Sequence, residues 1–250
     1  MVSRMTTNNS INNTVTNNDF DVNLDTAGSS SVSSVVHSDN TNTVSHAELR
    51  LEVGGTSGGD PNIYFNIPSG SDYSLGIDNT VTDDLVITDS TSPSTGNNIF
   101  RLYSDGNRRL EKNPAFYAEN LSGASNVTGD GTVYTIVANN ENFDQNNDFN
   151  GTTTFTAPVT GKYWFCLGFG TGPWGAQTGS QTQFVTSNQT YNSMVHGNIT
   201  NGATDTLICS TEIFADMDAL DTCTFTVAVS GSTKTISMTQ QTRMSGLLVV

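Results

Sequence analysis

Short runs in which apolar and polar residues alternate are the feature that most constrains the fold of this 250-residue chain. The clearest run is 223–229, where Cys223, Phe225, Val227 and Val229 alternate with threonine or alanine. Because successive side chains of an extended strand point to opposite faces, such a run predicts a strand with one buried face. Similar runs occur at residues 49–53, 63–67 and 73–77, each followed by glycine, proline or Asp-Asn turn residues. The pattern predicts an all-β protein.

The composition agrees with this fold class. Charged residues make up 13% of the chain, against about 25% in an average globular protein. Their place is taken by Asn, Thr, Ser and 23 glycines, which favour turns and strands over helices. The hydrophobic fraction of 34% is low for a monomer, which favours an oligomer whose copies complete one another's core. A partly disordered N-terminal half is the alternative.

The net charge of −15 argues against nucleic acid or anionic membrane as partners, because both would repel the chain. The chain has no apolar run long enough to cross a bilayer, and its first residues lack the apolar core of a secretory signal. We therefore expect synthesis in a cytoplasm and no membrane insertion. The basic residues Arg101, Arg108, Arg109 and Lys112 lie close together, either as a junction that pairs with Asp105 and Glu111 or as a docking patch for an acidic partner.

Nothing in the chain predicts catalysis. The histidines His37, His46 and His196 are dispersed, and no nucleophile, phosphate-binding or dinucleotide motif is present. Cys166, Cys209 and Cys223 lack the spacing of a metal site and are predicted to be buried free thiols. We expect a protein that is not an enzyme.

The chain divides into three predicted parts. Residues 1–46 are a string of Asn, Thr, Ser and Asp that cannot bury enough apolar surface to fold alone, so they are predicted to form an extended arm that orders on a partner. Residues 47–112 contain the first alternating runs and are predicted to form a small β module, a stalk. Residues 113–250 are the third part.

The N-terminal parts resemble known proteins of bacteriophages. The segments 39–46 (DNTNTVSH), 58–61 (GGDP) and 76–79 (GIDN) are similar to modules of tail-fibre and structural proteins. This resemblance implies a virion protein whose arm attaches it to other virion proteins.

Residues 113–250 resemble the C1q-like head domain, which is related to the tumour-necrosis-factor fold. Pro114-Ala-Phe116 matches its opening strand and residues 133–137 a later one. The central signature is matched by Phe149, Phe155, Gly161, Tyr163 and Phe165, and the closing strand by Ser245-Gly246-Leu247-Leu248. The resemblance implies a jelly-roll sandwich that assembles as a homotrimer and binds ligands with its exposed loops.

Two segments of this part are candidate binding sites. The glycine-rich segment 168–179 contains Trp174 and Gln177, and an aromatic side chain displayed there could stack on a sugar ring or a protein partner. Packing of Trp174 back onto the head is the alternative. The segment 142–148 offers Asp144 and Asp148 as oxygen ligands for calcium, and a simple Asn/Asp-rich turn is the alternative. No other cofactor is expected.

One alternative concerns secondary structure. Ile213, Phe214, Met217 and Leu220 could share one face of a short helix, because their spacing also fits a period of 3.6 residues.

These observations lead to one functional hypothesis and two alternatives. We expect a structural phage virion protein on the tail or capsid surface, a trimeric fibre or spike whose C-terminal head contacts a glycan or protein of the host surface. The first alternative is a capsid-decorating fibre without an essential receptor role. The second is a secreted or surface-bound adhesive C1q-like protein.

Overall fold

The computed structural model describes residues 51–250, apart from 54, 57, 81, 94–97 and 197–204. The predicted arm at residues 1–46, with His37 and His46, lies outside the described residues. The described residues form strands β1 to β17 and no helix, which confirms the predicted all-β class. No helix long and apolar enough to cross a membrane occurs among them.

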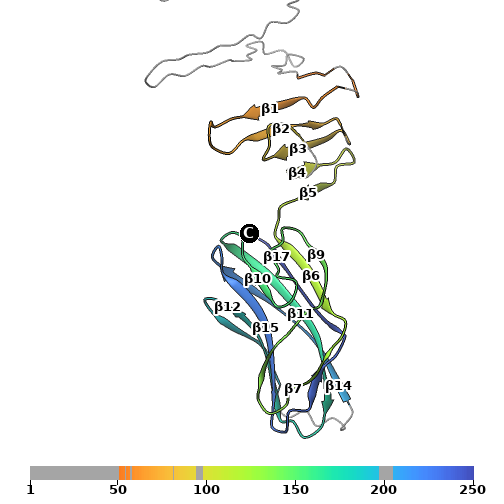
Figure 1. The fold of residues 1–250 in the computed structure, drawn as a ribbon, viewed down its shortest axis with the longest axis vertical. Helices are drawn as coiled ribbons and strands as arrows, with labels where there is room; N and C mark the ends of the chain where they lie inside the picture. The colour runs from red at the N-terminus through yellow and green to blue at the C-terminus, as the bar shows by residue number, and fades with distance from the viewer. Residues whose placement is uncertain (1–50, 54, 57, 81, 94–97, 197–204) are drawn as a thin grey trace, which may run out of the picture. The chain divides into compact units, whose positions relative to one another are not determined.

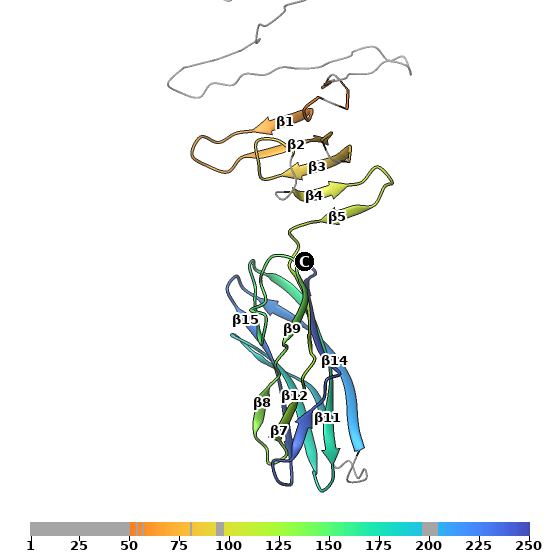
Figure 2. The same ribbon diagram turned by 45° about the vertical axis from the view of Figure 1, so that its right-hand side comes forward.

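Strands β1 to β5 form an antiparallel sheet in which each strand pairs with the next along the chain (Figures 1 and 2). All five lie inside the range 47–112 predicted for the stalk module. Their bounds are β1 Asn62–Phe65, β2 Tyr73–Asp78, β3 Asp84–Thr88, β4 Asn98–Leu102 and β5 Arg108–Leu110.

A buried charge cluster lies on one face of this sheet, around Arg101. The guanidinium of Arg101 donates to Asp84 at 2.8 Å, to Asp78 at 3.2 Å and to Glu111 at 2.9 Å. Burial alone would lower the pKa of Arg101, but hydrogen bonds to Asp84, Glu111 and Asp78 outweigh it and raise this pKa. The predicted pairing of the basic segment with Glu111 is confirmed, whereas Asp105 accepts hydrogen bonds from Asn107 instead.

The C-terminal part folds as a sandwich of two sheets. The first has the strand order β7-β16-β11-β17-β6-β9, with β14 paired along the other side of β11. The second has the order β10-β15-β12-β13, with β8 also paired to β15. The strands of the first sheet are β6 Ala115–Asn120, β7 Ala124–Thr128, β9 Asn140–Asp144, β11 Gly161–Trp174, β14 Asp205–Met217, β16 Ile236–Met238 and β17 Thr242–Leu248. Those of the second are β8 Val133–Thr135, β10 Thr154–Thr156, β12 Gly179–Thr186, β13 Thr190–His196 and β15 Thr222–Ser230.

The chain crosses repeatedly from one sheet of this sandwich to the other. It passes from β10 in the second sheet to β11 in the first, from β13 in the second sheet to β14 in the first, and from β15 in the second sheet to β16 in the first. The last strand, β17, lies between β11 and the early strand β6. Two antiparallel sheets joined by such crossings form a jelly roll. The strand order therefore confirms the predicted jelly-roll sandwich.

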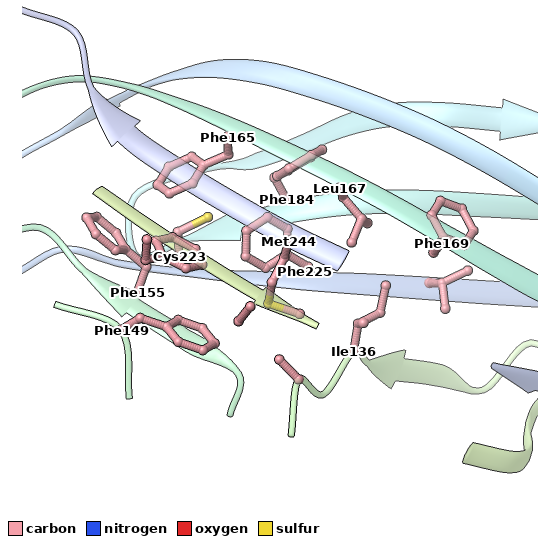
Figure 3. Close-up of a cluster of buried hydrophobic side chains, with 14 of the residues drawn as sticks. Ile136, Phe149, Phe155, Phe165, Leu167, Phe169, Phe184, Cys223, Phe225 and Met244 are labelled. Carbon is pink, nitrogen blue, oxygen red and sulfur yellow. The ribbon is translucent and has the colours of Figure 1, made fainter. Parts of the chain in front are cut away.

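A cluster of aromatic rings fills the space between the two sheets (Figure 3). Phe155 is its centre, with its ring centroid 5.4 Å from those of Phe116, Tyr163 and Phe165. Phe149 stacks on Phe116 with centroids 4.6 Å apart. These rings are fully buried or nearly so, and aromatic pairs at such distances add about 0.5–1.5 kcal/mol each beyond the area that they bury.

The helical alternative for the segment around Phe214 is wrong. Ile213, Phe214 and Met217 belong to β14, which pairs with β11 along its whole length. Leu220 lies in the turn that follows, with a positive φ of 74°. Pairing with the long strand β11 decides the conformation here. The backbone hydrogen bonds between the two strands favour an extended chain over the helix that the local spacing of apolar residues also fits.

Candidate interaction surface of the head

The outer face of the first sheet carries exposed apolar side chains, among them Phe143, Ile208 and Phe214. On β11, the buried side chains of Tyr163 and Phe165 alternate with the half-buried ones of Trp164 and Cys166. The period of two therefore sends every second side chain of each strand away from the aromatic core, onto a face that no other described element of the chain covers.

The strand register places three large apolar side chains in one row across this face. Phe214 on β14 lies opposite Trp164 on β11, and Trp164 lies opposite Leu247 on β17. The next residue of the row is Ala115 on β6. The Phe214 side chain, on the edge strand β14, is 66% exposed, an unusual state for a large aromatic residue.

A second, mixed row runs beside the first. It contains Glu212, Cys166, Ser245, Tyr117 and Phe143 in register. The rings of Tyr117 and Phe143 stack with centroids 6.4 Å apart, although 52% of Phe143 is exposed. The row thus extends the apolar surface to the edge strand β9.

Polar groups border these rows. The Tyr117 hydroxyl donates to Glu119 Oε1 at 2.7 Å, and this hydrogen bond raises the pKa of Tyr117 and lowers that of Glu119. On the other side of Trp164, Lys162 and Asp216 form an exposed ion pair at 2.6 Å. An apolar centre with a polar rim is the usual anatomy of a protein interface.

The residues of the predicted C1q-like signature divide between the core and this face. The core holds Phe149, Phe155, Tyr163 and Phe165. Leu247 lies on the outer face, in the row with Trp164. Gly161 lies where a Cβ would come within 2.6 Å of Leu248 Cδ1 and 2.9 Å of the Val250 carbonyl oxygen, so its lack of a side chain lets the C-terminal residues pack against β11.

The structure does not display Trp174 and Gln177 as a ligand-binding loop. Trp174 is 1% exposed and ends β11, and its indole N–H donates to the backbone carbonyl oxygen of Thr171 at 3.1 Å. Gln177 is 3% exposed and accepts a hydrogen bond from the Gly175 N–H at 2.6 Å. The alternative, that Trp174 packs onto the head, is the arrangement observed.

The glycines of segment 168–179 suggested an exposed loop, but the first part of this segment is a strand. Gly168 and Gly170 belong to β11 and not to a loop. A Cβ on Gly168 would come within 2.9 Å of the Arg243 side chain, and one on Gly170 within 2.3 Å of Thr239 Oγ1. These glycines therefore make room for neighbouring side chains, a role that glycine also has in strands.

Of the candidate calcium ligands, Asp144 ends β9 and Asp148 lies in the turn that follows. Asp144 accepts hydrogen bonds from the backbone N–H of Phe149 at 2.7 Å and of Asn146 at 3.4 Å, so its carboxylate holds the turn. Burial, and then the Asp144 charge, raise the pKa of Asp148. No group of three His, Cys, Asp or Glu side chains suited to a metal ion occurs in the described part of the chain. The turn alternative explains Asp144 without a metal ion.

Three exposed apolar residues of the face were not singled out from the sequence as site residues. Phe214 and Ile208, which is 62% exposed, lie on β14, and Phe143 lies on β9. A usable signal was the alternation across Ile208, Ser210, Glu212 and Phe214, which favours a strand with an outward apolar side chain at each end. The same residues around Phe214 also fit a helical spacing, so the alternation was not used to predict an exposed strand face.

Comparisons with known proteins give structural similarity only. No protein-family model matches the chain, and no curated protein matches it. Among solved structures, the globular domain of zebrafish complement 1qA protein matches with a TM-score of 0.40 and 16% identity, over 55% of this chain and 98% of that one. Murine APRIL at pH 5.0 matches with a TM-score of 0.39 and 8% identity, over 55% of this chain and 100% of that one. Identities this low say nothing about ligands or partners of this chain.

Proposed function

We propose that this chain is a homotrimeric, non-enzymatic structural protein of a bacteriophage particle, a fibre or spike whose jelly-roll head contacts the host surface. The observation that carries the proposal is the row of Phe214, Trp164 and Leu247 on the outer face of the head, in which Phe214 is exposed and the other two are half-buried. The sequence resemblance of residues 113–250 to C1q-like heads supports an assembly of three copies of this chain, since that family assembles as trimers.

Self-association is the simplest use of this face. A soluble monomer rarely leaves large aromatic side chains together on one open sheet face, and such patches mark protein contacts. Glu212 stands at the β14 end of the second row, and the other charged groups lie beside the rows: Lys162, Asp216 and Glu119. Copies of one chain related by a threefold axis can pack such apolar patches together and leave the charged groups near water.

Attachment to a particle is supported by the N-terminal parts. Residues 1–46 are rich in Asn, Thr, Ser and Asp, as expected of an arm that orders on a partner. The phage-like segments at 39–46, 58–61 and 76–79 favour other virion proteins as that partner. Three heads on one particle-bound stalk would also multiply weak contacts with a host glycan or protein.

The particle itself provides the test of this proposal. Purified particles of the phage that encodes the chain should contain the chain by mass spectrometry, and gold-labelled antibodies against residues 113–250 should mark projections on the tail or capsid by electron microscopy. Purified full-length protein should reduce adsorption of the particles to host cells. Absence of the chain from purified particles would make the virion assignment wrong, and labelling without competition for adsorption would leave a decorating fibre.

A further inference from the structure

The five-stranded sheet β1 to β5 has an apolar ladder on one face. In register across the five strands lie Ile63, Leu75, Ile87, Phe100 and Leu110. The strands follow one another side by side (Figure 1), so the ladder crosses the whole sheet perpendicular to the strands. Three of its side chains, Ile63, Ile87 and Leu110, are 38%, 39% and 55% exposed.

Neighbouring positions on the same face are also apolar. Phe65 and Tyr73, which lie opposite each other on β1 and β2, are 56% and 43% exposed. On the other side of the ladder, Ile77, Leu85 and Leu102 are in register. Only at the edge strand β5 does a charged residue, Arg108, join this row. The face is therefore apolar over most of its area.

The opposite face of the sheet is already covered. Ser74, Asp78, Asp84, Val86 and Thr88 are at most 2% exposed there. Loops of the same chain close over this face: the Asn79 side chain donates to the carbonyl oxygens of Gly55 and Gly58, and the Asn62 side chain donates to that of Thr91. The sheet thus has a closed polar face and an open apolar face, the reverse of an ordinary surface sheet.

We propose that the open face packs against the same face of two further copies of this chain, so that three β1–β5 sheets enclose an apolar axis as a three-sided prism. A single sheet needs a second layer over its apolar face. Identical sheets can provide it without any charge to neutralise, because the ladder contains no ionisable group. This inference rests on the proposed homotrimer, and it adds a second surface that is independent of the head.

The connection to the head favours copies of this chain over any other occupant. Only residues 111–114 separate the end of β5 from the start of β6. Four extended residues reach at most about 14 Å, so a trimeric head would hold the three sheets at a high effective concentration. The same tether makes the prism cooperative with the head interface.

Chemical cross-linking of the full-length chain tests this arrangement. Ile87→Cys places a thiol at the centre of the ladder, and Thr91→Cys, on an exposed loop over the closed face, is the matched control. Both are made with Cys166→Ser, because Cys166 lies on the proposed head interface. With a tris-maleimide reagent, Ile87→Cys should give roughly tenfold or more covalent trimer than Thr91→Cys, because the three thiols share one axis.

The solution mass of each variant separates the outcomes. A trimeric mass with covalent trimer at Ile87 and not at Thr91 supports the prism. A trimeric mass with equal, low cross-linking in both variants leaves the head trimer standing and overturns the prism, as would be the case if residues 1–50 or another protein covered the ladder. A monomeric mass overturns both proposals. Leu110→Cys repeats the test at a more exposed rung, in case Ile87→Cys folds poorly.

Discussion

Gly246 on β17 lies opposite Phe165 on β11, and the phenyl ring fills the space that a side chain at Gly246 would need. A Cβ on Gly246 would lie 2.6 Å from Phe165 Cδ1 and 2.7 Å from Phe116 Cε1. Both rings belong to the aromatic core and are held there by Phe155. The glycine of the closing strand is thus a packing requirement of the head.

Gly246→Ala should therefore destabilise the head. The added methyl must displace a buried ring, which costs about 1–3 kcal/mol in overpacked cores. Urea unfolding of the full-length chain measures the change. Gly175→Ala is the control, because its Cβ would meet only Gln177 Oε1, at 3.7 Å. Equal unfolding midpoints for both variants would contradict this account of the core.

The two tryptophans should respond differently to truncation. Trp174→Ala removes a side chain that is 1% exposed and should cost about 3–5 kcal/mol of folding stability. Trp164→Ala removes a half-buried side chain from the outer face, so it should weaken self-association more than folding. Thermal unfolding and light scattering on both variants separate the two effects, and a host-binding defect with unchanged stability in Trp174→Ala would restore a ligand role for that residue.

Arg101 should stabilise the β1–β5 sheet in a pH-dependent way. Hydrogen bonds from the Thr82 hydroxyl and from Arg101 hold the pKa of Asp84 below its ordinary value of 3.8, against the opposing effect of burial. A carboxyl whose folded pKa is lowered stabilises the fold above its ordinary pKa, and this contribution is lost as the pH falls through the folded value.

Arg101→Met should thus lower the thermal midpoint at pH 7, because Asp78 and Asp84 are left buried without a cation. The difference from wild type should shrink as the pH falls below 3.8, the ordinary pKa of Asp84, toward its lowered folded value. Arg109→Met, on the exposed strand β5 opposite Arg101, is the control and should have little effect at either pH. A pH-independent difference for Arg101→Met would argue against the charge cluster as its cause.

The native thiol of Cys166 can report on the proposed head interface through its rate of chemical labelling. Phe214→Glu introduces a charge into the central row, where 66% of the phenylalanine is exposed, so the head should fold but fail to associate. Maleimide labelling of Cys166 should be slow in wild type and fast in this variant. Cys223 should stay unreactive in both, because burial raises its thiol pKa. Val195→Glu, at a position 69% exposed on β13 in the other sheet, should leave labelling at the wild-type rate.

Alternation in the sequence predicted much of the fold. The run 223–229 became β15, and the run 73–77 became β2. Both strands pair with a neighbour on each side, so the backbone is extended and the alternating apolar side chains all point to one face, as the sequence pattern predicts. The aromatic signature around Phe155 and Tyr163 likewise predicted the core of the head.

Features that depend on distant residues were not predictable in this way. The glycines at 168 and 170 suggested a loop, yet Arg243 and Thr239, more than 60 residues away in the sequence, occupy the space beside them and keep the strand intact. The outward position of Phe214 depends on its pairing with Trp164. Register of this kind is fixed by the whole sheet and not by local periodicity.

The solution mass of the full-length chain, measured by light scattering after size-exclusion chromatography, tests the central claim most directly. A mass near three times 26.6 kDa for wild type, reduced to that of one chain or a mixture by Phe214→Glu but not by Val195→Glu, is the predicted result. A wild-type mass of one chain across the accessible concentration range would contradict the homotrimer and, with it, the fibre that the head and the β1–β5 sheet are proposed to form.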